Sequence, residues 1–206
     1  MQNISVYAIN INDIRAKQAE ALSLITPARK EKALRYRFEA DKLRCVAAGL
    51  LLRKYCSIYA DEQITVNEHG KPSCADTEFN ISHSGEWAIL CTAPCPVGID
   101  IELIKQSKPK SAARSFCKDE LCWMEQNADE RFYMLWTRKE SIIKAIGKGL
   151  KLPLKSFSVL PIDNSLHTVD GCTVYSRTKR FGYYAVSLTA FEPFDDFNII
   201  IDNNLL

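Results

Sequence analysis

The sequence predicts an α+β protein built from two similar halves, each with helices packed on a small, mostly antiparallel sheet. A length of 206 residues suits one large domain or two small ones. Helix-like and strand-like segments follow one another in the same order in both halves. Two nonapeptides, GEWAILCTA (85–93) and GYYAVSLTA (182–190), also match in residue type at six of nine offsets. We therefore expect pseudo-twofold subdomains at 1–104 and 105–206, with the functional site in the cleft between them.

The first half is expected to begin with a strand and two helices. Val6–Asn10 has the composition of a short strand. Thr26 followed by Pro27 predicts a helix start, because proline is favoured in the first helical turn, and the helix that follows is rich in arginine and lysine. Residues 41–55, DKLRCVAAGLLLRKY, place their apolar side chains on one stripe, which predicts an amphipathic helix.

A turn and three strands should complete the first half. HGKP at 69–72 predicts the turn. Phe79–Ser82 and Glu86–Thr92 predict a hairpin, and Val97–Leu103 predicts a further strand beside it.

The strand Val97–Leu103 is unusual because an apolar run carries two acids. Side chains alternate between the faces of a strand, so Val97, Ile99 and Ile101 should face the core. The other face then carries Asp100 and Glu102 about 7 Å apart, beside Gly98, which should leave space for a ligand. Two neighbouring carboxylates repel each other unless water or a cation screens them. The strand therefore faces either solvent or a metal ion.

The second half should contain one long helix and three strands. Residues 131–147 predict a helix that ends at Gly147, in the manner of a glycine C-cap. Ser156–Leu160, Cys172–Ser176 and Tyr183–Thr189 predict the strands.

Composition excludes several classes of protein. Apolar residues make up 47% and charged residues 25% of the chain, and the net charge of +2 is nearly balanced, so a general nucleic-acid or membrane binder is not indicated. Basic residues cluster locally at Arg29–Arg37, Lys105–Lys118 and Lys144–Lys155, which suits a phosphorylated ligand or an acidic partner.

The cysteine pattern and the apolar runs predict a cytoplasmic protein. The eight cysteines form no CxxC pair and fit neither a zinc ribbon nor a small disulfide scaffold, so we expect free thiols. The beginning of the sequence does not have the pattern of a signal peptide. The longest apolar run, Val46–Leu52, is too short to span a bilayer.

The predicted helix 131–147 carries the second unusual pattern. Glu140 and Lys144 lie one turn apart and face each other, while Lys139 falls on the apolar stripe. Taken alone, the first two residues predict an exposed ion pair worth a few tenths of a kcal/mol.

Beside the acidic strand, the same helix predicts a metal site. Asp100, Glu102 and Glu140 together offer three carboxylates, and Mg²⁺ prefers oxygen ligands shared with substrate phosphates and water. Lys139 and Lys144 would lie where phosphate oxygens arrive. Carboxylates with lysines, and without a cluster of cysteines or histidines, favour Mg²⁺ over Zn²⁺.

Other candidate motifs are weaker. His83 ends a predicted strand and suits phosphate binding or proton transfer, although a lone histidine is more often structural. Ser82 lacks the surroundings of a hydrolase nucleophile, which excludes a serine hydrolase. Lys71 has the pattern of a turn lysine. Neither GxxxxGK[ST] nor GxGxxG occurs, so neither a P-loop nor a Rossmann site is indicated.

The two unusual patterns together resemble a known signature. GIDIE (98–102), followed about forty residues later by WTRKESIIKA (136–145), looks like the paired signature of the 4′-phosphopantetheinyl transferases. FNISHSG (79–85) and GKP (70–72) match the elements that this family carries upstream. The resemblance is closest to the longer two-repeat type, which activates peptide and polyketide synthetases including surfactin synthetase. It extends over most of the chain, from residue 26 to residue 159.

The resemblance implies an enzyme that moves the phosphopantetheine arm of coenzyme A to a serine of an apo carrier protein and releases 3′,5′-ADP. It implies that Asp100, Glu102 and Glu140 hold Mg²⁺ or Mn²⁺ and that Lys144 stabilises charge on the phosphates. Glu140 is also the candidate base for the serine proton, directly or through water. Matching positions imply that coenzyme A is bound by Arg29, Lys32, Arg44, Lys71, Ser82, His83, Lys139 and Lys144.

The carrier protein implied by the resemblance is acidic. The basic segment Lys105–Lys118, which includes Lys108, Lys110 and Arg114 around Phe116, is therefore the expected docking site, and a solvated basic loop is the alternative. Two internal halves predict a monomer that completes its own site. Two other functions remain open: a noncatalytic Mg²⁺–nucleotide sensor or scaffold, which would not need Glu140 and Lys144 in the cleft, and an RNA-binding protein, which would need aromatic platforms beside the basic patches.

Overall fold

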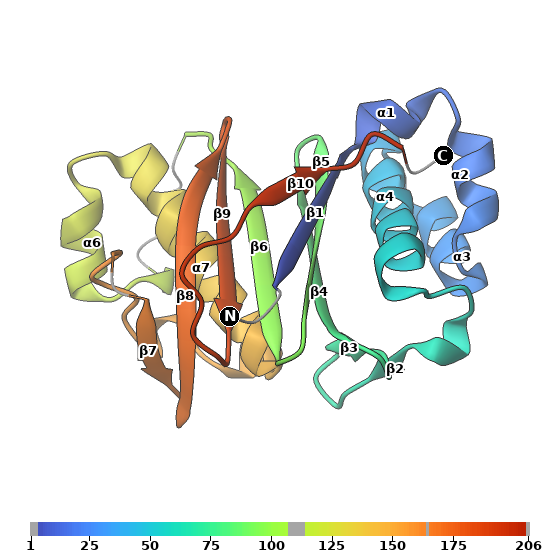
Figure 1. Cartoon of the computed structure of the whole chain (residues 1–206). Helices are drawn as coiled ribbons and strands as arrows, with labels where there is room; N and C mark the ends of the chain where they lie inside the picture. The colour runs from blue at the N-terminus through green and yellow to red at the C-terminus, as the bar shows by residue number, and fades with distance from the viewer. Residues whose placement is uncertain (1–3, 107–113, 164, 205–206) are drawn as a thin grey trace.

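The fold has four layers, in which two sheets lie between two groups of helices (Figure 1). The structure is a computed structural model that describes residues 4–106, 114–163 and 165–204. The first sheet has the strand order β10-β1-β5-β4 and the second has the order β6-β9-β8-β7, while β2 and β3 form a small separate pair. Fold class α+β is therefore confirmed.

The first half places its helices on one face of the first sheet. Helix α4 is the longest of them, and its buried side chains Leu43, Val46 and Leu50 pack against β1, β4 and β5. Pro27 begins α3, as predicted. The elements are β1 (Ser5–Asn10), α1 (Ile11–Arg15), α2 (Gln18–Leu24), α3 (Pro27–Arg35), α4 (Glu39–Cys56), the 3₁₀ helix η1 (Asp61–Gln63), β2 (Thr65–Val66), β3 (Pro72–Ser73), β4 (Glu78–Ser84) and β5 (Trp87–Ala93).

The second half places α7 and α6 on the outer face of the second sheet. Helix α7 ends at Gly147, which has a left-handed φ of 77°, as the predicted C-cap requires. The elements are β6 (Val97–Leu103), α6 (Lys118–Met124), α7 (Ala128–Ile146), the 3₁₀ helices η2 (Gly149–Lys151) and η3 (Leu154–Ser156), β7 (Leu166–Val169), β8 (Cys172–Phe181), β9 (Tyr184–Ala190) and β10 (Ile199–Ile201).

The two halves repeat one arrangement. A strand, a long helix and a hairpin follow each other as β1-α4-β4-β5 and again as β6-α7-β8-β9, and the sheet order β1-β5-β4 matches β6-β9-β8. The two similar nonapeptides form the central strands β5 and β9 with their hairpin turns, and Gly85 and Gly182 both have positive φ there. Strand β10 returns to pair with β1 (Figure 1). The subdomain boundary between residues 104 and 105 stays a prediction.

The predicted core face of β6 is confirmed. Val97, Ile99 and Ile101 are fully buried between the two sheets, where they share a hydrophobic cluster with Val6 of β1 and Leu188 of β9. The acidic face of β6 therefore points away from this core, toward α7 and β4.

The role expected of Gly98 is wrong. It leaves no space for a ligand, because a Cβ atom at this position would lie 2.1 Å from the carbonyl oxygen of Ser141 and 2.4 Å from the amide nitrogen of Ala145. The missing side chain instead lets the backbone of α7 pack directly on β6. Close packing of helix on strand brings the side chains of α7 to the acidic face.

One predicted strand of the second half is wrong, and two short ones, β7 and β10, were missed. Ser156–Leu160 forms no strand, because its backbone groups bond to side chains: the carbonyl oxygen of Phe157 accepts from Lys139, and the amide of Val159 donates to Glu120. Strand β7 was missed because four residues at a sheet edge carry too little alternation to be recognised.

We predict that Gly98→Ala destabilises the fold by about 1–3 kcal/mol, since overpacking forces the backbones of β6 and α7 apart. In a chain of this length, each kcal/mol lowers Tm by about 2–4 °C. Thermal unfolding followed by circular dichroism measures the change. Gly171→Asn is the control, because Gly171 has an open surrounding and asparagine tolerates its positive φ. A Tm of Gly98→Ala equal to that of the wild type would contradict the prediction.

Candidate functional site

The candidate site is built at the seam where the two sheets meet. Strand β4 is the last strand of the first sheet and β6 is the first strand of the second, and they lie side by side. Side chains of β4, spaced two residues apart, accept backbone N–H groups of β6: Asn80 Oδ1 from Ile99 at 2.9 Å, Ser82 Oγ from Ile101 at 3.4 Å and Ser84 Oγ from Leu103 at 3.1 Å. We call Asn80, Ser82 and Ser84 the β4–β6 seam.

The seam also holds both acids of β6. Ser82 Oγ donates to Asp100 Oδ1 at 2.8 Å, and Ser84 Oγ donates to Glu102 Oε2 at 2.6 Å. Lys144 of α7 completes the arrangement, because its ammonium donates to Asp100 Oδ1 at 2.6 Å and to the carbonyl oxygen of Ile99 at 3.2 Å. Lys144 thus pairs with strand β6 instead of with Glu140, so the exposed helical ion pair that the helix alone predicts is wrong.

Three carboxylates influence one another at this place. Burial raises the pKa of Glu140, and the negative charges of Asp100 and Glu102 raise it further. Burial likewise raises the pKa of Glu102, with Asp100 adding to the effect. The Oδ2 atom of Asp100 is buried and, among the described residues, has no hydrogen-bond partner. A buried carboxylate oxygen without a partner is costly unless a cation or donor from outside the chain meets it.

The donor chemistry of this site fits a hard divalent cation. Carboxylate oxygens, one of them unpartnered, are the ligands of Mg²⁺, which usually binds one or two carboxylates and completes its shell with phosphate oxygens and water. Across residues 4–106, 114–163 and 165–204, no three His, Cys, Asp or Glu side chains stand close enough to hold a metal by themselves. Asp100, Glu102 and Glu140 could therefore hold such an ion only together with ligands from outside the chain, such as phosphate oxygens and water.

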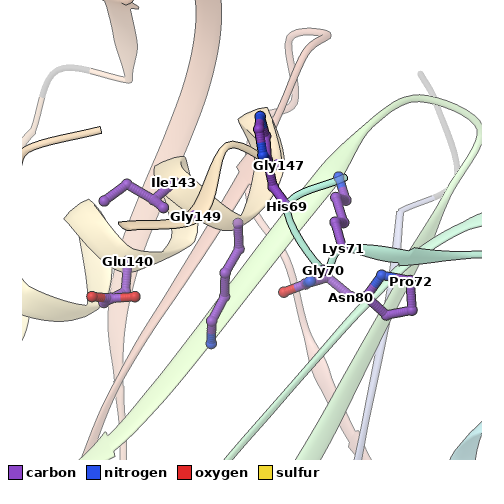
Figure 2. A pocket seen from close by; sticks show the side chains of 10 residues that line it. His69, Gly70, Lys71, Pro72, Asn80, Glu140, Ile143, Gly147 and Gly149 are labelled. Carbon is purple, nitrogen blue, oxygen red and sulfur yellow. The ribbon is translucent and has the colours of Figure 1, made fainter. Parts of the chain in front are cut away.

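A pocket of about 270 Å³ opens on one side of these acids (Figure 2). Glu140 projects from α7 on one side, and Lys71, Pro72 and Asn80 lie on the other. The pocket is lined by His69, Gly70, Lys71, Pro72, Asn80, Glu140, Ile143, Lys144, Gly147 and Gly149. It lies between the two halves, as predicted for the functional site.

Lys71 lines this pocket and holds its wall in place. Its ammonium donates to the carbonyl oxygen of Ala145 in the last turn of α7 at 2.9 Å and to that of Val97 at 3.3 Å. Burial lowers the pKa of Lys71. Asn67 donates to the carbonyl oxygen of Gly147 from the same loop at 3.0 Å. The 67–71 loop therefore clamps the end of α7 to the first half.

A second hollow, of about 330 Å³, lies on the other side of the acids. Ser84, Glu102 and Lys105 line it together with an aromatic wall from the first turns of α7: Phe132, Tyr133 and Trp136. The acidic centre thus separates a basic pocket from an aromatic one.

Some of the predicted basic residues gather near His83. Partial desolvation lowers the pKa of His83, and the charges of Arg44, Lys144 and Lys32 lower it further. Arg44 is held by the carbonyl oxygen of Gly85 and by the carboxylate of Asp41. Since His83 and Ser82 are neighbours on β4, they point to opposite faces. Ser82 faces the acids, and His83 faces the basic group.

Two predicted coenzyme A residues lie elsewhere. Lys139 is fully buried, pairs with Glu120 at 2.9 Å and donates to the carbonyl oxygen of Leu154 at 2.7 Å, so its assignment as a ligand contact is wrong. It faces α6 because the helix turns it away from Glu140 and Lys144. The side chain of Arg29 packs against α4 at Gly49. A Cβ atom at that glycine would lie only 2.6 Å from the Cδ of Arg29.

The predicted docking segment has no exposed apolar anchor at Phe116. That ring is fully buried beside Phe132, in the core of α6 and α7, which contradicts the expected role. Arg114 and Lys118 are exposed and keep the basic character of the segment. Lys108 and Lys110 lie outside the described residues.

Sequence reasoning missed His69, Asn80, Ser84 and Trp136 as parts of the site. The alternation of polar residues at 80, 82 and 84 was a readable signal, because three polar side chains on one face of a strand need partners. His69 and Trp136 stand in the quoted motifs HGKP and WTRKESIIKA, but only tertiary contacts bring them to the pockets.

Comparisons with known proteins cover most of the chain. Residues 12–95 match the family described as "4'-phosphopantetheinyl transferase, N-terminal", and residues 96–202 match the "4'-phosphopantetheinyl transferase superfamily". The chain is 40% identical to 4'-phosphopantetheinyl transferase Sfp of Bacillus subtilis (strain 168) over 150 residues, which is 67% of each protein. It is 36% identical to 4'-phosphopantetheinyl transferase gsp of Aneurinibacillus migulanus over 181 residues, or 83% of this chain and 72% of that protein.

A more distant relative is the L-aminoadipate-semialdehyde dehydrogenase-phosphopantetheinyl transferase of Mus musculus. It is 29% identical over 188 residues, which cover 75% of this chain and 59% of that protein. Among the described residues, no helix has both the length and the apolar character needed to cross a membrane.

We predict that Lys139→Met destabilises the protein by about 3–5 kcal/mol, because it leaves Glu120 buried and unpaired. Urea unfolding measures the loss. Adding Glu120→Gln should recover a large part of it, since the amide keeps acceptor and donor atoms without a buried charge. Equal instability of the single and double variants would argue against this ion pair.

We predict that Glu140→Gln raises Tm at pH 7 but not at pH 4. Because the pKa of Glu140 is raised in the folded state, its contribution to stability is present at low pH and is lost as pH rises through the folded pKa. Removing the charge should therefore add about 1 kcal/mol at pH 7, or about 2–4 °C. Thermal scans at both pH values, in EDTA, test this, and an equal difference at both would refute it.

Proposed function

Because the chain belongs to the 4′-phosphopantetheinyl transferase superfamily, we propose that it moves the 4′-phosphopantetheine arm of coenzyme A to a serine of an apo carrier protein. Enzymes of this superfamily use coenzyme A as a substrate and act on carrier proteins. One observation carries the proposal for this site: the unpartnered buried oxygen of Asp100 lies in an acidic centre between a basic and an aromatic pocket, opposite Lys144.

The proposed reaction is a phosphoryl transfer. The serine oxygen of the carrier forms a bond to the phosphorus that bears the pantetheine, and the bond from that phosphorus to the bridging pyrophosphate oxygen breaks. The bond electrons leave with 3′,5′-ADP, and the serine proton passes to a base. Positioning and charge stabilisation supply most of the catalysis in such reactions.

The acids and Lys144 would meet the pyrophosphate. Asp100, Glu102 and Glu140 would hold Mg²⁺, or Mn²⁺ in its place, with phosphate oxygens completing the shell. When bound, the metal supplies charge neutralisation on the attacked phosphate and on the leaving group. Lys144, already aimed at Asp100, would shift its hydrogen bonds to the phosphate oxygens as negative charge moves toward the leaving group.

Glu140 is the proposed base. Burial raises the pKa of Glu140 toward the working pH. A base with such a pKa accepts the proton of a serine hydroxyl more readily, directly or through one water. The Glu140 side chain makes no hydrogen bond to the described residues, so the oxygen that does not hold the metal could accept one from the incoming hydroxyl.

The nucleotide end of coenzyme A is proposed to enter the basic pocket. His69 and Lys71 line this pocket. Lys32 and His83 lie outside its lining, but they are exposed and suit a phosphate of the same ligand. Arg44 can join them by exchanging its contact with Asp41. Ser82 is better explained as a support of Asp100 than as a phosphate contact, because its hydroxyl is buried against β6.

The carrier is proposed to approach from the side of the aromatic pocket. Lys105, Arg114 and Lys118 are exposed there or in the segment that follows β6, and an acidic carrier would be attracted by them. Both halves of the site come from one chain, which supports a monomer. All eight cysteines are free, which supports a reducing compartment such as the cytoplasm.

We predict that the purified protein with coenzyme A and Mg²⁺ makes an apo carrier heavier by one phosphopantetheine arm, as measured by mass spectrometry. Lys144→Ala should lower kcat about 100- to 1000-fold, since it removes a donor that stabilises developing charge. Lys179→Ala is the control and should keep the wild-type rate, because this half-buried lysine of β8 pairs with Asp196 and lines neither pocket. Coenzyme A binding without a change in the mass of any carrier in a panel would favour the noncatalytic sensor.

A further inference from the structure

We propose that Ser84 is a positioning residue, which aims the Glu102 carboxylate at the metal, as Ser82 aims that of Asp100. The inference rests on the proposed function, because it concerns the metal of that same site. It concerns residues of the β4–β6 seam, whose backbone contacts alone would give them a purely structural role.

The hydrogen bonds of Ser84 have only one possible direction. The amide of Leu103 is a donor, so at 3.1 Å the Ser84 oxygen must accept from it. A serine hydroxyl has a single proton, which is then left for Glu102 Oε2 at 2.6 Å, and an ionised carboxylate can only accept. Ser84 is therefore fixed on one side by a strand backbone and on the other by an acid.

Ser82 repeats this pattern one step along the strand. Its oxygen accepts from the amide of Ile101 and from Lys144 Nζ at 3.1 Å, and its proton goes to Asp100 Oδ1 at 2.8 Å. One oxygen of Asp100 is thereby occupied, while Oδ2 stays buried and unpartnered among the described residues. A donor on one oxygen leaves the other to a ligand, and the matching bond from Ser84 to Oε2 imposes the same division on Glu102.

Asn80, the third member of the seam, distinguishes closing the sheet junction from orienting an acid. Asn80 accepts the amide of Ile99 at 2.9 Å and so closes the sheet junction as the serines do. The matching position on β6 is Gly98, however, which has no side chain, and Asn80 donates to no carboxylate among the described residues. Closing the junction needs only an acceptor, whereas aiming an acid needs a hydroxyl that accepts and donates at once. Serine stands at the two seam positions that adjoin acids.

Loss of such a support normally weakens metal binding by about 10- to 100-fold, because the ligand can then rotate and its electron density is less well directed. We therefore expect Ser84→Ala to raise the dissociation constant of the metal at least about 10-fold. Ser84→Thr keeps the hydroxyl in a residue that strands accept well, and it should restore most of the affinity.

The experiment measures metal binding without turnover. Mn²⁺ is titrated into each variant with saturating coenzyme A and no carrier, and free Mn²⁺ is followed by electron paramagnetic resonance. Ser84→Ala should bind Mn²⁺ at least about 10-fold more weakly than the wild type and Ser84→Thr. Ser158→Ala is the matched control, because it removes a serine that donates to the carboxylate of Asp119 at 2.7 Å outside the seam, and it should keep the wild-type Mn²⁺ affinity. In the transfer assay, the Mg²⁺ concentration for half-maximal rate should rise with Ser84→Ala, and kcat at saturating Mg²⁺ should largely return.

Two outcomes would overturn the proposal in different ways. A folded Ser84→Ala with wild-type Mn²⁺ affinity, beside a metal-dependent wild type, would overturn the role of Ser84 alone. Full transfer by the wild type in excess EDTA would instead overturn the metal of the proposed function, and the role of Ser84 with it. If Ser84→Ala does not fold, Ser84→Cys keeps the volume with a weaker donor, and unchanged Mn²⁺ affinity in that variant would also refute the proposal.

Discussion

Everything in this site depends on how the two sheets are joined along β4 and β6. The amides of Ile99, Ile101 and Leu103 face β4, and a buried amide without an acceptor costs about 1–3 kcal/mol. Side-chain oxygens of the β4–β6 seam meet this need. Because two of these oxygens belong to hydroxyls, the same bonds that close the junction also hold Asp100 and Glu102. Stability of the junction and orientation of the acids are therefore one feature of the structure.

Helix α7 places Glu140 and Lys144 beside the seam. One face of this helix packs in the core, and the other carries the charged side chains of the site. Gly98 allows the helix backbone to touch β6, so Glu140 and Lys144 arrive beside Asp100. On the opposite face, Lys139 is locked to Glu120 in a fully buried ion pair. One face thus fixes the position of the helix, and the other presents charges to the cleft. Lys139 and Lys144 stand five residues apart on the same helix, yet the first anchors the helix and the second belongs to the site.

The repeated arrangement allows equivalent positions in the two halves to be compared. The positions that hold the acids in the second half hold core side chains in the first. When β5 is aligned with β9 through the two nonapeptides, the pairing registers place Tyr7 of β1 at the position of Asp100 and Ile9 at that of Glu102. Tyr7 stacks on Tyr55 of α4 with ring centroids 3.5 Å apart, and Ile9 is buried. The same strand–helix contact is therefore filled by apolar side chains in the first half. In the second half it holds acids, which sacrifice packing for the place where the proposed function puts a cation and phosphates.

The sequence by itself determined the α+β class, the repeat, the core face of β6, and the paired acidic strand and helix, because a period of two or 3.6 residues decides which side chains share a face. Tertiary structure decided what each face meets. Lys139 and Lys144 both looked suitable for phosphate, yet packing buried the first and turned the second to Asp100. Phe116 looked like an exposed anchor but lies in a core, and Ser82 looked like a ligand contact but supports an acid. These outcomes depend on contacts between segments far apart in the chain, which no local spacing contains.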